Sequence, residues 1–243
     1  MAAAADAHPL DNAGWHALTG PHAGFAIGED CARRYGPDVS VFSAVDAVTP
    51  AAWDDLARLP GNESFIVLFR DSVSEPPKDW TTQARGWAHQ MSVSSGFSVG
   101  AGTGTGTGQI ERLTTDHVGD MLALIALTEP GPFLPRTIEL GDYFGVFDDG
   151  RLVAMAGERL RLEGHTEVSA VCTHPDVRGR GLAAALTHRV AAQILERGEQ
   201  PFLHVAETND NARRVYERLG FATRRLIEFA VLRPPRRRPA LTD

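Results

Sequence analysis

The hydrophobic pattern of the second half of the chain alternates between short strand-like runs and helical stripes. Apolar runs of strand length occupy 143–147, 152–160, 167–173, 202–206 and 221–232. Asp148-Asp149-Gly150 separates the first two runs and is a strong hairpin signal. Apolar residues at helical spacing occupy 118–125, 181–197 and 212–219. The pattern predicts an α/β (α+β) protein in which strands and helices pack together.

The first half of the chain has a weaker pattern of the same kind. A short helix is predicted to start at Pro50, since proline suits the first helical turn. Phe65–Phe69 and His89–Val93 are strand candidates. Between the halves, a run of glycine, threonine and serine cannot pack a core, and we interpret it as a linker or mobile loop. The predicted organisation is an α/β region at 1–93, a linker at 94–108, a main domain at 109–233 and a flexible tail at 234–243.

Composition narrows the classes of protein that the chain can belong to. A net charge of −7 over 243 residues argues against nucleic acid as the main partner. No apolar run approaches the ~18 residues of a membrane span, and the N-terminus does not resemble a signal peptide. Two cysteines form no disulfide framework, so we expect a soluble cytoplasmic protein, with a homodimer left open. No metal is expected, because the spacing of His8, His16, His22 and Cys31 fits no metal-binding pattern.

The sharpest local feature is a strand, a turn and a helix between Glu167 and Ala183. Glycines at the start of a helix leave backbone N–H groups unpaired, and the helix N-terminus carries partial positive charge. Arg178 and Arg180 lie in the same turn and add full positive charges. The segment therefore predicts a binding site for an anion such as a diphosphate.

A dinucleotide-binding fingerprint is one interpretation of this turn. Gly179-x-Gly181-x-x-Ala184 matches the spacing G-x-G-x-x-G/A. That fingerprint directly follows its strand, whereas five residues, His174–Arg178, intervene here. The acid at a suitable distance, Glu199, precedes the next strand instead of ending it. A nicotinamide-dependent oxidoreductase is therefore the weakest of three functional hypotheses.

A second motif favours another interpretation. Arg178-x-x-Gly181-x-Ala183 follows His174-Pro175-Asp176, and about thirty residues later Asn209–Phe221 has the spacing N-x-x-A-x-x-x-Y-x-x-x-G-F. Together these motifs resemble those of the GCN5-related N-acetyltransferases, the GNAT superfamily, and over 110–232 the sequence is most similar to its FR47-like branch. That branch also resembles the acyltransferase part of glycine N-acyltransferases. The resemblance implies a GNAT fold, with a mixed, mostly antiparallel sheet flanked by helices, and a degenerate GNAT-like copy in the N-terminal half.

The resemblance also implies the activity and the cofactor site. It implies an acetyl-CoA-dependent N-acetyltransferase in which a primary amine, on a small molecule, amino acid or peptide, attacks directly in a ternary complex. The pantetheine of acetyl-CoA is expected between the strands 167–173 and 202–206, with its diphosphate on the turn that starts the following helix. The implied cofactor-binding residues are Val171, Cys172, Thr173, Arg178, Gly179, Arg180, Gly181, Leu182, Ala183, Asn209, Ala212 and Tyr216.

Three residues are catalytic candidates. Tyr216 matches the family tyrosine that protonates the leaving thiolate or holds its sulfur; the alternative is a tyrosine packed on the inner face of its helix. The resemblance implies a base or a water-holding group at Glu167 and Ser169, since they match positions where some relatives place one. They lie two apart on one strand and so share a face, and a partly dry cleft can raise the pKa of a carboxylate toward that of a useful base. Glu158 and Glu139 are rival bases, and a water chain without a dedicated base is a further alternative.

The acceptor itself is not defined by the sequence. Phe133, Arg136 and Glu139 lie where relatives place a specificity loop, and Arg136 is a candidate for binding an acceptor carboxylate. A surface ion pair is the alternative role for Arg136. The Cys172 side chain is expected to be an inert core thiol. The alternative function for the whole chain is a non-catalytic acyl-CoA-binding module with the same fold.

Overall fold

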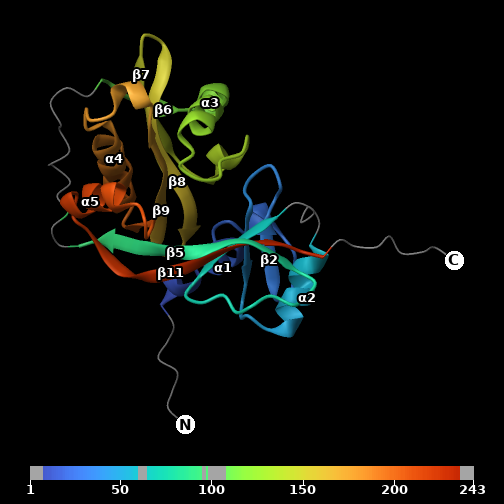
Figure 1. Ribbon diagram of the computed structural model, residues 1–243. Coiled ribbons are helices and arrows are strands. Elements are labelled where there is room, and N and C mark those ends of the chain that lie inside the picture. Colours follow the sequence, from blue (N-terminus) through green and yellow to red (C-terminus); the bar gives the residue numbers. More distant parts are fainter. Residues whose placement is uncertain (1–7, 60–64, 95–96, 98–107, 236–243) are drawn as a thin grey trace.

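One mixed sheet runs through the described chain, which comprises residues 8–59, 65–94, 97 and 108–235 of this computed structural model (Figure 1). The strand order is β1-β2-β3-β4-β11-β5-β10-β9-β8-β7-β6. The strands are β1 Ala26–Ile27, β2 Ala32–Tyr35, β3 Phe42–Val45, β4 Ile66–Arg70, β5 Thr81–Val93, β6 Ile110–Leu113, β7 Tyr143–Asp148, β8 Arg151–Leu162, β9 His165–Thr173, β10 Gln200–Ala206 and β11 Phe221–Arg233. The pairs β3/β4 and β9/β10 are parallel and the other pairs are antiparallel. This confirms the predicted mixed, mostly antiparallel sheet.

Helices flank the sheet on both faces. They are α1 Ala13–Thr19, α2 Pro50–Arg58, α3 Val118–Thr128, α4 Leu182–Glu196 and α5 Asp210–Arg218. Short 3-10 helices occupy Pro9–Asn12, Ala23–Phe25, Thr115–His117, Thr137–Leu140 and Pro175–Val177. Around β8 and β9, α4 and α5 pack on one face of the sheet and α3 packs on the other (Figure 1). The two faces of β9 therefore lie in different surroundings.

Local sequence accounts for the elements of the second half. Leu182, Leu186, Val190 and Ile194 form one stripe of α4, and each is 5% exposed or less. Asp149 and Gly150 have φ values of 48° and 74°, which the two-residue turn between β7 and β8 requires. Such signals lie close together in the sequence. Each strand and helix predicted for this half is present in the structure, and its ends differ from the predicted ones by only a few residues.

The first half is only partly as predicted. The helix from Pro50 and the strand at Phe65–Phe69 correspond to α2 and β4, but His89–Val93 is only the end of the much longer β5. The strands β1, β2 and β3 and the helix α1 were not predicted from the sequence. Ser43 shows why: it is a polar residue in a fully buried strand, which interrupts the apolar pattern.

The strands of the two halves interleave at the centre of the sheet. β11 pairs with β4 and β5, and β5 pairs with β10. On each side of the central β11/β5 pair comes one antiparallel neighbour and then a parallel pairing, β4/β3 on one side and β10/β9 on the other. That order is what a degenerate duplicate would have, but the duplication and the domain limits stay predictions. The predicted linker at 94–108 and the tail at 234–243 lie largely outside the described residues.

Candidate functional site

The site begins where two parallel strands separate. β9 and β10 are paired only from His165 to Glu167 and from Gln200 to Phe202. β9 then continues to Thr173 and β10 to Ala206 without pairing to each other. Unpaired strand edges present backbone N–H and C=O groups. The opening between the strands is thus lined by hydrogen-bonding groups on its β9 edge.

A bulge in β9 determines which of these groups face the opening. Ala170 has a φ of 53°, and the pairing with β8 shifts register between Cys172 and Ser169. Beyond the bulge, the His174 N–H donates to Val153 O at 2.7 Å, so His174 points toward β8. Alternate residues of an antiparallel strand point to alternate edges. Val171 and Thr173 therefore present their backbone groups to the opening, whereas the Cys172 backbone faces β8.

The turn before α4 adds the predicted anion-binding site. Gly179 and Gly181 have φ values of 82° and 80°, a backbone conformation that makes concave groups of N–H donors. The first N–H groups of a helix have no intrahelical partners, and no side chain of the described residues caps those of α4. Arg178 Nε donates to Thr173 O at 3.3 Å, which links the turn to the end of β9. Arg180 departs from the prediction: it lies 3.7 Å from Asp148 and does not line the pocket described next.

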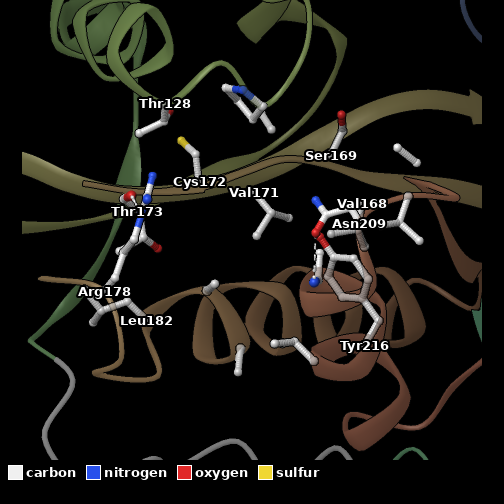
Figure 2. A pocket seen from close by; sticks show the side chains of 18 of the residues that line it. Thr128, Val168, Ser169, Val171, Cys172, Thr173, Arg178, Leu182, Asn209 and Tyr216 are labelled. Carbon is white, nitrogen blue, oxygen red and sulfur yellow. Dashed lines mark hydrogen bonds between the residues drawn. The ribbon is translucent and has the colours of Figure 1, made fainter. Parts of the chain in front are cut away.

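A pocket of about 690 Å³ joins the opening to this turn. β9 contributes Val168–Thr173, the turn and α4 contribute Arg178, Gly179, Gly181, Leu182 and Ala183, and α5 contributes Asn209, Ala212 and Tyr216. Val171 and Tyr216 project into the pocket from opposite sides, while Ser169 points to the other side of β9 (Figure 2). The pocket thus reaches both faces of β9. Apart from Arg180, it brings together the residues predicted to bind the cofactor, with Cys172 contributing its side chain rather than its backbone.

Tyr216 lies on α5 at the inner wall of the pocket. Its side chain is buried against Phe221, and burial raises the pKa of Tyr216 to about 12. The hydroxyl makes no hydrogen bond with any other described residue. A few residues earlier, the Asn209 side chain accepts from the Ala212 N–H at 3.1 Å and fixes the start of α5. Tyr216 therefore offers a protonated hydroxyl to a molecule in the pocket.

Comparisons with known proteins place the chain in a family. Residues 143–230 match the model of the family described as FR47-like protein. The chain is similar to an acetyltransferase of the GNAT family from Novosphingobium aromaticivorans, whose crystal structure is known. The two sequences are 36% identical, and the structures superpose with a TM-score of 0.82 over 93% of this chain and 98% of that one. The chain belongs to the GNAT superfamily, in its FR47-like branch. A search of the curated proteins finds none that is significantly similar.

More distant GNAT structures share the fold. A GCN5-related N-acetyltransferase from Kribbella flavida is 19% identical, with a TM-score of 0.58 over 92% of this chain and 96% of that one. A GCN5-related N-acetyltransferase-like protein from Streptococcus suis is 15% identical, with a TM-score of 0.53 over 89% and 92%. Acetyltransferases of the GNAT superfamily generally use acetyl-CoA. Both resemblances extend over the N-terminal half as well as the motif-bearing half.

The predicted base Glu167 binds neighbouring side chains of the protein and does not line the pocket. Its carboxylate is fully buried and accepts two hydrogen bonds from Arg159, at 2.7 and 2.8 Å, and one from His204 Nδ1 at 2.7 Å. Burial raises the pKa of Glu167, but the partners outweigh burial and lower it to about 2. Ser169 lines the pocket described above and Glu167 does not, although both lie on the same face of β9.

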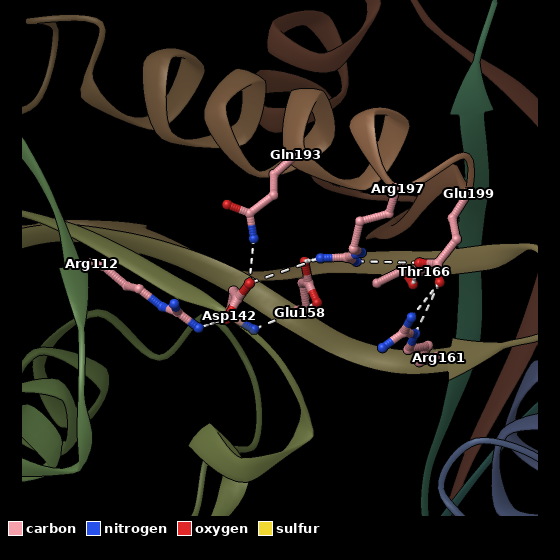
Figure 3. A network of polar contacts seen from close by, with 8 residues as sticks. All are labelled: Arg112, Asp142, Glu158, Arg161, Thr166, Gln193, Arg197 and Glu199. Carbon is pink, nitrogen blue, oxygen red and sulfur yellow. Dashed lines mark hydrogen bonds and ion pairs between the residues drawn. The ribbon is translucent and has the colours of Figure 1, made fainter.

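The rival carboxylates are also engaged elsewhere. Glu158 is buried and accepts from Arg197 at 2.7 Å, and burial raises its pKa despite that partner. Both residues belong to a polar network between the sheet and the C-terminal end of α4 (Figure 3). The pocket is lined by the first turns of α4, so this network lies at the other end of the helix. We assign it a structural role.

The predicted specificity loop does not reach the pocket. Phe133 is buried in the core against Tyr143. Arg136 binds Glu139 through two hydrogen bonds of 2.7 Å and binds Asp38 at 3.1 Å. The hydrogen bond from Arg136 lowers the pKa of Glu139. Arg136 thus forms the surface ion pair that was its alternative role.

The pocket lining includes residues that were not predicted from the sequence, among them Glu129, Arg159 and His204. Glu129, at the end of α3, is the acid that lines the pocket within the described part of the chain, and its φ of 46° is unusual for a glutamate. Arg159 and His204 line the pocket together with Ser169. Their partner Glu167 is 8 and 37 residues away. Glu129 alone had a sequence signal, since it precedes Pro130 and the residue before a proline favours the end of a helix.

Three further observations concern the cysteine thiol, metal ligands and membrane-spanning helices. Cys172 is buried, and burial raises the pKa of its thiol to about 11, as expected for an unreactive core thiol. In the described residues, no cluster of three histidine, cysteine, aspartate or glutamate side chains has the geometry to hold a metal ion. None of the described helices is both long and apolar enough to cross a membrane.

Proposed function

We propose that the chain is an acetyl-CoA-dependent N-acetyltransferase that transfers an acetyl group to a primary amine by direct attack in a ternary complex. The observation that carries this proposal is the junction of the β9/β10 opening with the uncapped start of α4. The opening offers backbone groups to pantetheine amides, and the turn at Gly179–Gly181 offers N–H groups to a diphosphate. Because the pocket reaches both faces of β9, an acetyl donor and an amine can meet between the strands.

The proposed reaction assigns a role to each side of the pocket. The nitrogen of the neutral amine forms a bond to the thioester carbonyl carbon, and the C–S bond then breaks. The Val171 N–H, which points into the opening, donates to the oxyanion of the intermediate. Tyr216 keeps its proton at neutral pH, because its pKa is about 12, and donates to the leaving thiolate. The amine nitrogen loses its proton to water on the side of Ser169 and Glu129, and Tyr216 regains its own proton from water.

Ligand-induced stabilisation tests the donor site first. Thermal unfolding is measured for the protein alone and with acetyl-CoA, CoA or NADH. A ligand at ~100 times its Kd contributes ~2.7 kcal/mol, which raises the midpoint by roughly 5–10 °C for a chain of this size. We expect this shift with acetyl-CoA and CoA but not with NADH. A shift with NADH alone would refute the proposal.

Turnover then separates an enzyme from a binding module. Release of CoA thiol is measured with a panel of amines. Acetyl-CoA binding without thiol release from any amine would favour the non-catalytic acyl-CoA-binding module instead. For the enzyme, Tyr216→Phe is expected to lower kcat about 100-fold and to leave the CoA-induced shift unchanged. Tyr143→Phe is the matched control, since the Tyr143 hydroxyl is buried, has no partner and lies outside the pocket.

A further inference from the structure

A charged side chain forms part of the pocket wall on the acceptor side. Arg159, on β8, lines the pocket together with Ser169 and His204. Its side chain is only 13% exposed. Burying an ion pair costs desolvation energy, and well-packed apolar residues are often as stable in its place. A buried arginine at a pocket wall therefore calls for an explanation beyond stability.

Arg159 has donors that the protein does not use. Its Nε and Nη2 bind the two oxygens of Glu167, at 2.8 and 2.7 Å. Its third nitrogen, Nη1, makes no hydrogen bond with any described residue. Because Arg159 lines the pocket, the two N–H groups of Nη1 are available to a molecule bound there.

The guanidinium is held in a fixed orientation. It stacks on Phe42 of the N-terminal half, with 4.5 Å from Cζ to the ring centre. Glu167 is fixed in turn by His204 Nδ1, and His204 Nε2 lies 3.1 Å from the Gln90 amide nitrogen. That amide also donates to Leu10 O at 2.8 Å. A group that is already oriented loses less conformational freedom when it binds a ligand.

We propose that Arg159 binds the carboxylate of the acceptor, so that the acceptor is an amine that also carries a carboxylate, as an amino acid does. This proposal rests on the N-acetyltransferase function proposed above. A guanidinium matches the planar geometry of a carboxylate. Glu167 already lies beside Arg159, so a singly charged carboxylate is favoured over a doubly charged phosphate.

The test compares acceptors that differ in one charge. Amino acids and their amides have nearly the same shape, and only the amino acids carry the carboxylate. The ratio of kcat/KM for the two is measured in the wild type and in two variants, so that differences in amine basicity cancel between proteins. The first variant, Arg159→Lys, keeps a positive charge for Glu167 but removes the spare nitrogen. The second, Arg161→Lys, is the matched control on the same strand, since Arg161 pairs with Glu199 outside the pocket.

The proposal makes a quantitative prediction. The wild type is expected to prefer the amino acid by about 10- to 100-fold, the range for a hydrogen bond between charged groups. Arg159→Lys is expected to lose that preference mainly through KM, and Arg161→Lys to keep it. The melting shift with CoA reports whether each variant is folded. If Arg159→Lys does not fold, the wild-type ratio alone still decides.

Failure of this proposal differs from failure of the proposed function. If the wild type acetylates amides as well as amino acids, or Arg159→Lys keeps the preference, the function stands and the Arg159 assignment is wrong. An aminophosphonate used as efficiently as the matching amino acid would also overturn the preference for a single charge. If no amine releases CoA thiol, the acetyltransferase function and the Arg159 assignment both fall.

Discussion

Replacing Glu167 with glutamine separates a structural role from a catalytic one. In the structure, the Glu167 carboxylate is the charge partner of the buried Arg159 and accepts a hydrogen bond from His204. Glutamine has nearly the same shape but cannot neutralise Arg159. Removing one partner of a buried pair leaves an uncompensated charge, which costs about 3–5 kcal/mol of stability. Glu167→Gln is therefore expected to be markedly less stable than the wild type at pH 7.

The pH dependence of this loss follows from the pKa of Glu167. The pKa is about 2 in the folded protein and has an ordinary value of 4.5. Because the folded state lowers the pKa, the stabilisation is present above pH 4.5 and is lost as the pH falls toward 2. The difference between these values corresponds to about 3 kcal/mol, of which about 2 kcal/mol is lost by pH 3. The stability difference between wild type and Glu167→Gln should narrow by about 2 kcal/mol between pH 7 and pH 3.

Urea denaturation at several pH values measures this difference. Glu163→Gln is the matched control, since Glu163 is an exposed residue of the turn between β8 and β9. The control should match the wild-type stability at each pH. If Glu167→Gln were as stable as the wild type at pH 7 while its pH–rate profile lost the acidic limb, Glu167 would be the general base and our structural assignment would be wrong.

Two further predictions each compare a pair of glycine-to-alanine substitutions. Gly181→Ala and Gly164→Ala both place a side chain at positive φ with open space for the Cβ, so each should cost about 1 kcal/mol of stability by urea denaturation. Only Gly181→Ala should weaken CoA binding in a titration, and equal affinities would argue against the turn before α4 as the diphosphate site. Gly157→Ala would bring a Cβ within 2.2 Å of the buried Tyr143 ring, and should destabilise by about 1–3 kcal/mol. Gly119→Ala, in α3 with nothing within 4 Å of its Cβ, should instead stabilise by about 0.5 kcal/mol; the same sign for both would refute the packing argument.

The side of the pocket proposed to bind the acetyl donor could be predicted because its signals are local. The strand, the glycine turn and the start of α4 lie within Glu167–Ala183, and the capping residue of α5 lies seven residues before Tyr216 in the sequence. Backbone conformation at Gly179 and Gly181 depends on residue type and on immediate neighbours. The sequence therefore placed these residues correctly, although it could not show that Arg180 turns toward Asp148 or that the bulge at Ala170 points the Cys172 backbone away from the opening.

The side of the pocket proposed to bind the acceptor could not be predicted, because its contacts span the chain. Strand alternation correctly put Glu167 and Ser169 on one face of β9. It could not show that Arg159, held against Phe42 by stacking, covers Glu167. Burial of a carboxylate costs desolvation free energy, which only hydrogen-bonding and charged partners that fold next to it can offset. We therefore infer a structural role for Glu167, although its place on the strand suggested a base.

The N-terminal half contacts residues that line the pocket but does not line the pocket itself. Among the described residues, none before Thr128 lines the pocket. Yet Phe42 stacks on Arg159, and Gln90 contacts His204 while binding Leu10. The residues of the proposed donor side all belong to the second half. The orientation of Arg159 and His204, by contrast, depends on packing between the two halves. Changes in the N-terminal half that alter this packing should change the choice of acceptor before they change the binding of CoA.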